Sequence, residues 1–120
     1  MSLIKKIFNT FFHTKKWVLI YRKEHDEKWS ELNQPKDVSR ADPFIIKKNK
    51  KTYIFFEEFK IAERKGYICV GELDLENNKL INVRTVLKKK YHLSFPFIFE
   101  YKNDMYMTPE GHENSTLDLY

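Results

Sequence analysis

The stretch Asp42-Pro43-Phe44-Ile45-Ile46 decides the fold, because most of it recurs 53 residues later as Pro96-Phe97-Ile98-Phe99. The repeat continues without a gap, and the further matches are Tyr53 with Tyr106 and Glu57 with Glu110. An internal period of this size indicates a repeat architecture. In each copy two short apolar runs flank a two-residue turn that contains Asn, Asn49-Lys50 and then Lys102-Asn103, which predicts a β-hairpin.

Apolar runs outside the two hairpins predict further short strands. The expected strands are 17–22, 42–48, 51–57, 66–74, 81–88, 95–101, 104–109 and 116–120, with a loop over 23–40. Around a two-residue turn the pairing rule places Asp42 opposite Glu57 and Phe95 opposite Glu110. Four antiparallel strands in about fifty residues match one blade of a β-propeller. The alternative is one twisted antiparallel sheet or a small sandwich in which two hairpins are similar by chance.

The predicted fold is therefore all-β: residues 16–120 form one propeller blade and most of a second, a truncated copy of the complete ring. Residues 1–15 form a separate segment in which apolar side chains fall on one helical face, with lysines opposite. This pattern predicts a short amphipathic helix. Residues 2–12 would then contact an anionic membrane peripherally, or the helix would pack on the domain itself.

Composition excludes several classes of function. The chain has 120 residues and a net charge of +5, but its lysines cluster at predicted turns and strand ends, without a base-reading motif, so nucleic-acid binding is not expected. The lone thiol, Cys69, lies in an apolar run, which indicates a buried, inert side chain in a reducing, cytoplasmic compartment. Four scattered histidines do not make a zinc site, and no nucleotide loop is present, so neither metal nor cofactor is expected.

Several motifs together resemble a known family. They are Ala41-Asp42-Pro43-Phe44, Tyr53-Ile54-Phe55-Phe56-Glu57-Glu58-Phe59, Lys65-Gly66-Tyr67-Ile68, Tyr91-His92-Leu93-Ser94-Phe95-Pro96-Phe97, Tyr106-Met107-Thr108-Pro109-Glu110 and Leu117-Asp118-Leu119-Tyr120. The chain resembles the N-terminal domain of plant glucosamine inositolphosphorylceramide transferases and related bacterial proteins. The resemblance implies a five-bladed propeller associated with glycosyltransferases, and we expect a bacterial source. That family in turn resembles arabinanase and β-xylosidase glycosidases, whose general base is an Asp at the start of an innermost strand.

The resemblance and the hairpin geometry together select the candidate site. Asp42 is the first choice for a catalytic carboxylate, with Glu57 and Glu110 as partners, because glycoside hydrolysis needs paired carboxyl groups. Phe95 stands where a second blade would repeat Asp42, which departs from the glycosidase pattern. The substrate-binding candidates are His92, Glu58, Trp17 and Tyr91, and a stacking floor for a sugar would combine Trp17, Trp29, Tyr91 and Phe95.

Three functions remain open from the sequence. The first is a module that binds a glycan or glycolipid precursor and serves a transferase in surface-polysaccharide assembly. The second is a partial or degenerate glycosidase that uses Asp42 with Glu57 or Glu110. The third is a protein-interaction scaffold without a small-molecule site.

Overall fold

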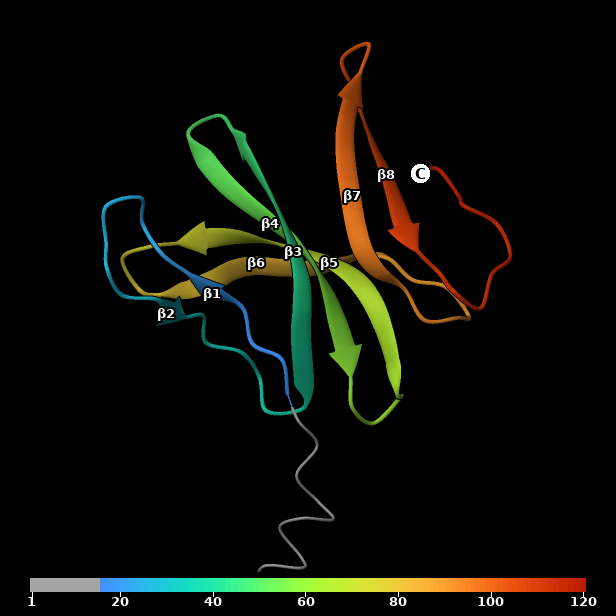
Figure 1. Ribbon diagram of the computed structural model, residues 1–120, viewed down its shortest axis with the longest axis horizontal. Coiled ribbons are helices and arrows are strands. Elements are labelled where there is room, and N and C mark those ends of the chain that lie inside the picture. Colours follow the sequence, from blue (N-terminus) through green and yellow to red (C-terminus); the bar gives the residue numbers. More distant parts are fainter. Residues whose placement is uncertain (1–15) are drawn as a thin grey trace, which may run out of the picture.

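The computed structural model describes residues 16–120, and these residues form eight β-strands and no helix (Figure 1). The strands are β1 (Ile20–Tyr21), β2 (Ser30–Glu31), β3 (Val38–Lys48), β4 (Lys51–Lys60), β5 (Lys65–Asp74), β6 (Lys79–Leu87), β7 (Ser94–Tyr101) and β8 (Asp104–Glu110). They make three antiparallel sheets: the β1-β2 ribbon, the four-stranded sheet β3-β4-β5-β6, and the β7-β8 hairpin. The predicted all-β class is confirmed.

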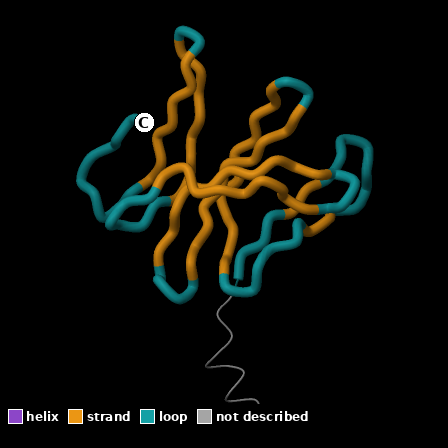
Figure 2. The backbone as a smooth tube through the Cα atoms, turned by 180° about the vertical axis from the view of Figure 1, so that it is seen from behind, coloured by secondary structure: helices purple, strands orange, loops and turns teal. Residues whose placement is uncertain are grey.

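The two repeated hairpins form because their turns favour a left-handed backbone. Both central turn residues have positive φ in each hairpin, 52° and 63° at Asn49 and Lys50, then 50° and 69° at Lys102 and Asn103. Positive φ at both positions is the geometry of a type I′ turn, and Asn adopts it more readily than most residues. The predicted turns are therefore confirmed, and each hairpin ends in its own turn (Figure 2).

Each hairpin carries a β-bulge at the same place in the repeat. In β3 the pairing passes from Ala41 opposite Glu57 to Phe44 opposite Phe55, so two residues face one. In β7 it passes from Ser94 opposite Glu110 to Phe97 opposite Thr108. The expected pairings of Asp42 with Glu57 and of Phe95 with Glu110 are therefore wrong by one residue.

Two apolar cores lie on opposite faces of the four-stranded sheet. On one face Ile54, Phe56 and Cys69 pack with Leu19 and Leu32 from the N-terminal ribbon. On the other face a separate cluster joins the sheet to the β7-β8 hairpin and consists of Ile68, Leu93, Ile98 and Met107, with Phe44, Ile46 and Phe55 at its margin. The two faces alternate along each strand, because successive side chains of a strand point to opposite sides.

The ends of the chain differ from the sequence-based expectations. The predicted strand 17–22 shortens to β1, and β2 lies inside the predicted loop 23–40. The strand expected at 116–120 does not form. Only Tyr120 exchanges backbone hydrogen bonds with Met107, because Asp118 accepts bonds from Thr116 and Asn114 that curl the segment.

The amphipathic helix predicted over residues 1–15 lies outside the described residues. Within residues 16–120 no helix is long and apolar enough to cross a membrane. The three sheets do not close into a ring, and the two hairpins belong to separate sheets instead of continuing one another.

Candidate functional site

Two carboxyl groups meet beside the bulge of β3. Asp42 lies in the bulge with φ of 52°, and Glu57 lies on β4, where its side chain is only 12% exposed. Although the two residues are out of direct register, their carboxyl groups lie close enough to interact. Burial, followed by the interaction with the carboxyl group of Asp42 and its negative charge, raises the pKa of Glu57 to about 7. Near neutral pH the pair therefore exchanges a proton easily.

His92 completes this cluster from the connection between β6 and β7. Its Nε2 lies 3.4 Å from Oε1 of Glu57, and its Nδ1 accepts a 3.0 Å hydrogen bond from the backbone N–H of Gly66. Burial, and then the nearby charge of His112, lower the pKa of His92. The imidazole is therefore neutral near pH 7 and presents its Nε2–H to Glu57.

Gly66 permits this close approach. A Cβ atom on Gly66 would stand 2.6 Å from the carbonyl oxygen of Leu93, 2.8 Å from Oε1 of Glu57 and 2.8 Å from Cε1 of His92. Contacts this short are not tolerated, so only glycine lets the β6-β7 connection lie against β4 and β5.

The carboxyl pair opens into a cavity of about 740 Å³ at the outer edge of β3, where the N-terminal segment before β1 also lines it. Exposed aromatic side chains share its lining with the carboxyl pair, so the wall offers both hydrogen-bonding and apolar surface. The lining includes Trp17, Asp42, Glu57, Phe59 and Phe95. Trp17 is fixed there by its backbone, because its carbonyl accepts from Arg40 N–H at 3.1 Å and its N–H donates to Ser39 Oγ at 2.7 Å.

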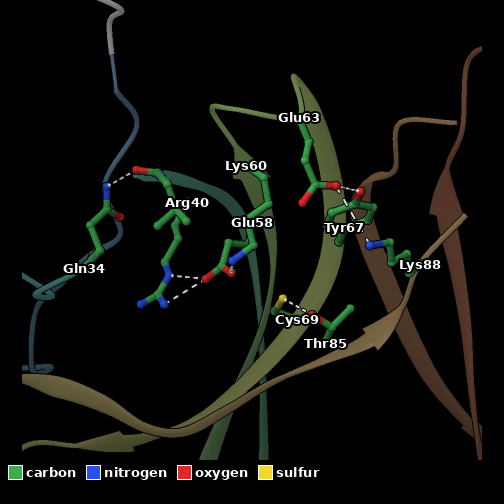
Figure 3. A network of polar contacts seen from close by, with 10 residues as sticks. Gln34, Arg40, Glu58, Lys60, Glu63, Tyr67, Cys69, Thr85 and Lys88 are labelled. Carbon is green, nitrogen blue, oxygen red and sulfur yellow. Dashed lines mark hydrogen bonds and ion pairs between the residues drawn. The ribbon is translucent and has the colours of Figure 1, made fainter. Parts of the chain in front are cut away.

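Glu58 lies outside the cavity, in a buried ion pair (Figure 3). Its Oε2 is 2.8 Å from Nη2 and 2.9 Å from Nε of Arg40, and its Oε1 is 2.6 Å from Nζ of Lys60. The side chains of Arg40 and Glu58 are each 6% exposed. Glu58 follows Glu57 in β4 and therefore points to the opposite face. This geometry leaves Glu58 no access to a ligand in the cavity.

The other candidate residues lie apart from the Asp42–Glu57 pair. Tyr91 bonds to Asp118 and Asn114 in the C-terminal loop and does not line the cavity. Glu110 is exposed at the end of β8, near enough for its charge to act on His92. Trp29 is exposed and lies against the guanidinium of Arg22. Of the expected stacking floor, only Trp17 and Phe95 share a wall.

Two further features of the site, the bulges and the close approach at Gly66, have signals in the sequence. Pro43 and Pro96 lack a backbone N–H, and a proline inside a strand indicates an edge or a bulge; both occupy the bulges. Gly66 is one of only three glycines in the chain and lies inside a strand, which indicates a close backbone approach. Within residues 16–120 no group of three His, Cys, Asp or Glu side chains is placed to hold a metal ion.

Comparisons with known proteins agree with the resemblance in the sequence. The family described as glucosamine inositolphosphorylceramide transferase 1, N-terminal, matches residues 27–120. Glucosamine inositolphosphorylceramide transferase 1 from indica rice is 34% identical over 80 residues, which cover 67% of this chain and 11% of the rice protein. The Arabidopsis thaliana protein of the same name is also 34% identical over 80 residues, or 10% of its length.

The chain thus spans about a tenth of the relatives it matches. No solved structure matches it. These relatives are plant proteins, which contradicts the expectation of a bacterial source. The family match extends over most of the described strands and includes Asp42, Glu57 and His92, and the chain belongs to the family of glucosamine inositolphosphorylceramide transferase 1 N-terminal domains.

Proposed function

We propose that this chain is a carbohydrate-binding module that serves a glycosyltransferase, and that its ligand site is the cavity beside Asp42 and Glu57. The observation that carries the proposal is the carboxyl pair that opens into a cavity of about 740 Å³ beside the exposed indole of Trp17. Carboxylates accept hydrogen bonds from sugar hydroxyls, and an aromatic ring packs against the C–H face of a sugar. A cavity of this volume accommodates one or two sugar rings.

The family supports the choice of ligand. The name of the relatives contains a sugar, glucosamine, and a sphingolipid with an inositol phosphate headgroup, inositolphosphorylceramide. A glycan or the headgroup of a glycolipid precursor is therefore the ligand class we propose here, with a transferase domain or protein as the partner. His92 holds Glu57 in place in this proposal, since Nε2 of His92 lies 3.4 Å from the carboxyl oxygen of Glu57.

The proposed overall architecture is a five-bladed propeller, of which the four-stranded sheet is one blade and the β7-β8 hairpin begins another. Two observations support it: the hairpins repeat the same turn and the same bulge, and they lie in separate sheets that share an apolar cluster. In that architecture β3 and β7 are inner strands, and the cavity faces the central channel.

The glycosidase alternative has weaker support from the geometry. Retaining glycosidases hold their two carboxyl groups about 5 Å apart and inverting enzymes hold them farther apart, to leave room for a sugar carbon or a water. Asp42 lies close enough to Glu57 to raise the pKa of that carboxyl group, and the equivalent position of the second hairpin carries Phe95 instead of a further carboxylate. A ligand-binding pair fits this arrangement better than a catalytic pair.

The test is a binding panel measured by ligand-observed NMR and calorimetry. The panel contains glucose, glucosamine, galactose, mannose, glucuronic acid and myo-inositol. We expect at least one of these compounds to bind, and Asp42→Asn to weaken that binding by about tenfold with the fold unchanged, as for one lost charged hydrogen bond. Glu100→Gln, an exposed change on β7, is the matched control. If no compound binds, or if Asp42→Asn binds as tightly as the wild type, the proposed ligand site is wrong and a protein-interaction scaffold becomes the better-supported function.

A further inference from the structure

Asp42 and Phe95 occupy the same position of the repeat, and both have an unusual backbone. Asp42 has φ of 52° and Phe95 has φ of 45°, and each is the residue that enters the β-bulge just before a proline. The bulges interrupt equivalent pairings, after Ala41 opposite Glu57 and after Ser94 opposite Glu110. The two copies of the repeat therefore share a bulge with a positive φ before a proline. The side chain at this position differs, because it is a carboxylate in the first copy and an aromatic ring in the second.

The left-handed conformation is tolerated by Asp but is unfavourable for Phe. Asp and Asn enter this region more often than other residues, whereas a bulky side chain there is a steric outlier. Phe95 is also 60% exposed, so burial of its ring does not explain the conformation. Strained residues of this kind cluster where a side chain must be presented to a ligand.

Both bulge residues line the same cavity. Asp42 and Phe95 approach it from β3 and β7, and Trp17 approaches it from the N-terminal segment. Phe97, two residues along β7 and 56% exposed, does not line the cavity; its ring packs edge-on against Phe44 at 5.6 Å. The bulge thus separates one exposed aromatic side chain of β7 from its neighbour and directs it into the cavity wall.

We propose that the bulge position of each repeat presents a side chain that reads the ligand, a carboxylate at Asp42 for hydroxyl groups and an aromatic ring at Phe95 for the apolar face of a hexopyranose. This proposal rests on the carbohydrate-binding function and adds the specificity-determining residue. A ring with equatorial substituents presents an uninterrupted C–H face to Phe95, while its hydroxyls at the rim reach Asp42. The axial hydroxyl of galactose interrupts one face only, so glucose, glucosamine and galactose each keep a C–H face that fits against Phe95.

The binding test uses the same six-compound panel with variants at two positions of β7. For each sugar that binds the wild type, we expect Phe95→Ala to weaken binding about tenfold, as for a lost aromatic contact, and Phe95→Trp to keep it within threefold. Phe97→Ala is the matched control and should change binding less than twofold. If a sugar binds the wild type and Phe95→Ala binds it equally well, this inference is wrong while the carbohydrate-binding function stands. If no sugar binds the wild type, both this inference and the proposed carbohydrate-binding function are wrong.

A second measurement tests the backbone argument without any ligand. At an ordinary strand position alanine is more stable than glycine, whereas at positive φ glycine is the more stable of the two. We expect the melting temperature of Phe95→Gly to exceed that of Phe95→Ala, and the order to reverse for the same pair at Phe97, whose φ is not positive. If the alanine variant is more stable than the glycine variant at both positions, the backbone at Phe95 is not strained. The argument that the bulge position presents a side chain to the ligand is then wrong.

Discussion

Glu57→Gln should make the protein more stable at alkaline pH, which is the opposite of the usual effect of losing a buried hydrogen-bonding carboxyl group. The pKa of Glu57 rises from 4.5 in the unfolded chain to about 7 in the fold. Below pH 4.5 the carboxyl group is neutral in the folded and unfolded states and does not change the free energy of unfolding. Between pH 4.5 and about 7 the folded state binds more protons, so the free energy of unfolding falls as pH rises. The full shift corresponds to about 3 kcal/mol.

Glutamine is always neutral, so the variant avoids this loss. We expect an advantage for the variant of less than about 1 kcal/mol at pH 5 and of about 3 kcal/mol at pH 8. The lowered pKa of His92 has the opposite sign, since it makes stability rise with pH up to about 6.5, but it acts in both proteins and largely cancels in their difference.

Urea unfolding followed by tryptophan fluorescence at pH 5 and pH 8 measures this difference. Glu100→Gln is the control, since it removes an exposed carboxyl group from β7 and should leave the pH dependence as in the wild type. A wild type and a Glu57→Gln variant with parallel pH profiles would refute the shared proton, and so would a variant that is less stable at pH 8.

Three further predictions concern packing. Arg40→Met should lower the free energy of unfolding by about 1 to 3 kcal/mol because it leaves the buried charge of Glu58 with Lys60 as its partner, and adding Glu58→Leu should recover most of that loss in the same urea assay. Gly66→Ala should lower it by about 1 to 3 kcal/mol, since the new methyl group meets the carbonyl oxygen of Leu93 at 2.6 Å; an unchanged melting temperature would contradict the tight fit. Phe97→Lys should reduce self-association in sedimentation velocity, because Phe97 belongs to the exposed apolar face of β7; a wild type that stays monomeric at high concentration would show that this face does not associate.

Most of the local structure could be predicted from the sequence. The 53-residue repeat, the two Asn-containing turns and the apolar runs located β3, β4, β5, β6, β7 and β8 to within a few residues. The β1-β2 ribbon could not be predicted from the repeat, the turns or the apolar runs. Strands β1 and β2 have two residues each and depend on contacts with distant segments, such as the hydrogen bond from Leu32 N–H to the carbonyl of Leu19.

The candidate site was predicted only in part. Asp42, Glu57 and His92 were selected from the sequence, and the fold places them within one cluster. Glu58 was selected as well, but it lies on the opposite face of β4 in an ion pair with Arg40. Glu57 and Glu58 differ by one position along β4, and neighbouring side chains of a strand point to opposite faces of the sheet. The sequence does not say which face carries the cavity, so it could not separate the two residues.

The sequence by itself therefore determined the features that depend on short-range conformational preference: the two-residue turns, the strands around them and the repetition of both. Only the tertiary structure decided which side chains meet. The bulge moves Asp42 out of register with Glu57, yet their carboxyl groups still interact, and Trp17 and Phe95 reach the same cavity from distant parts of the chain. Such meetings depend on how whole sheets pack, and packing is a property of non-local contacts that no short segment encodes.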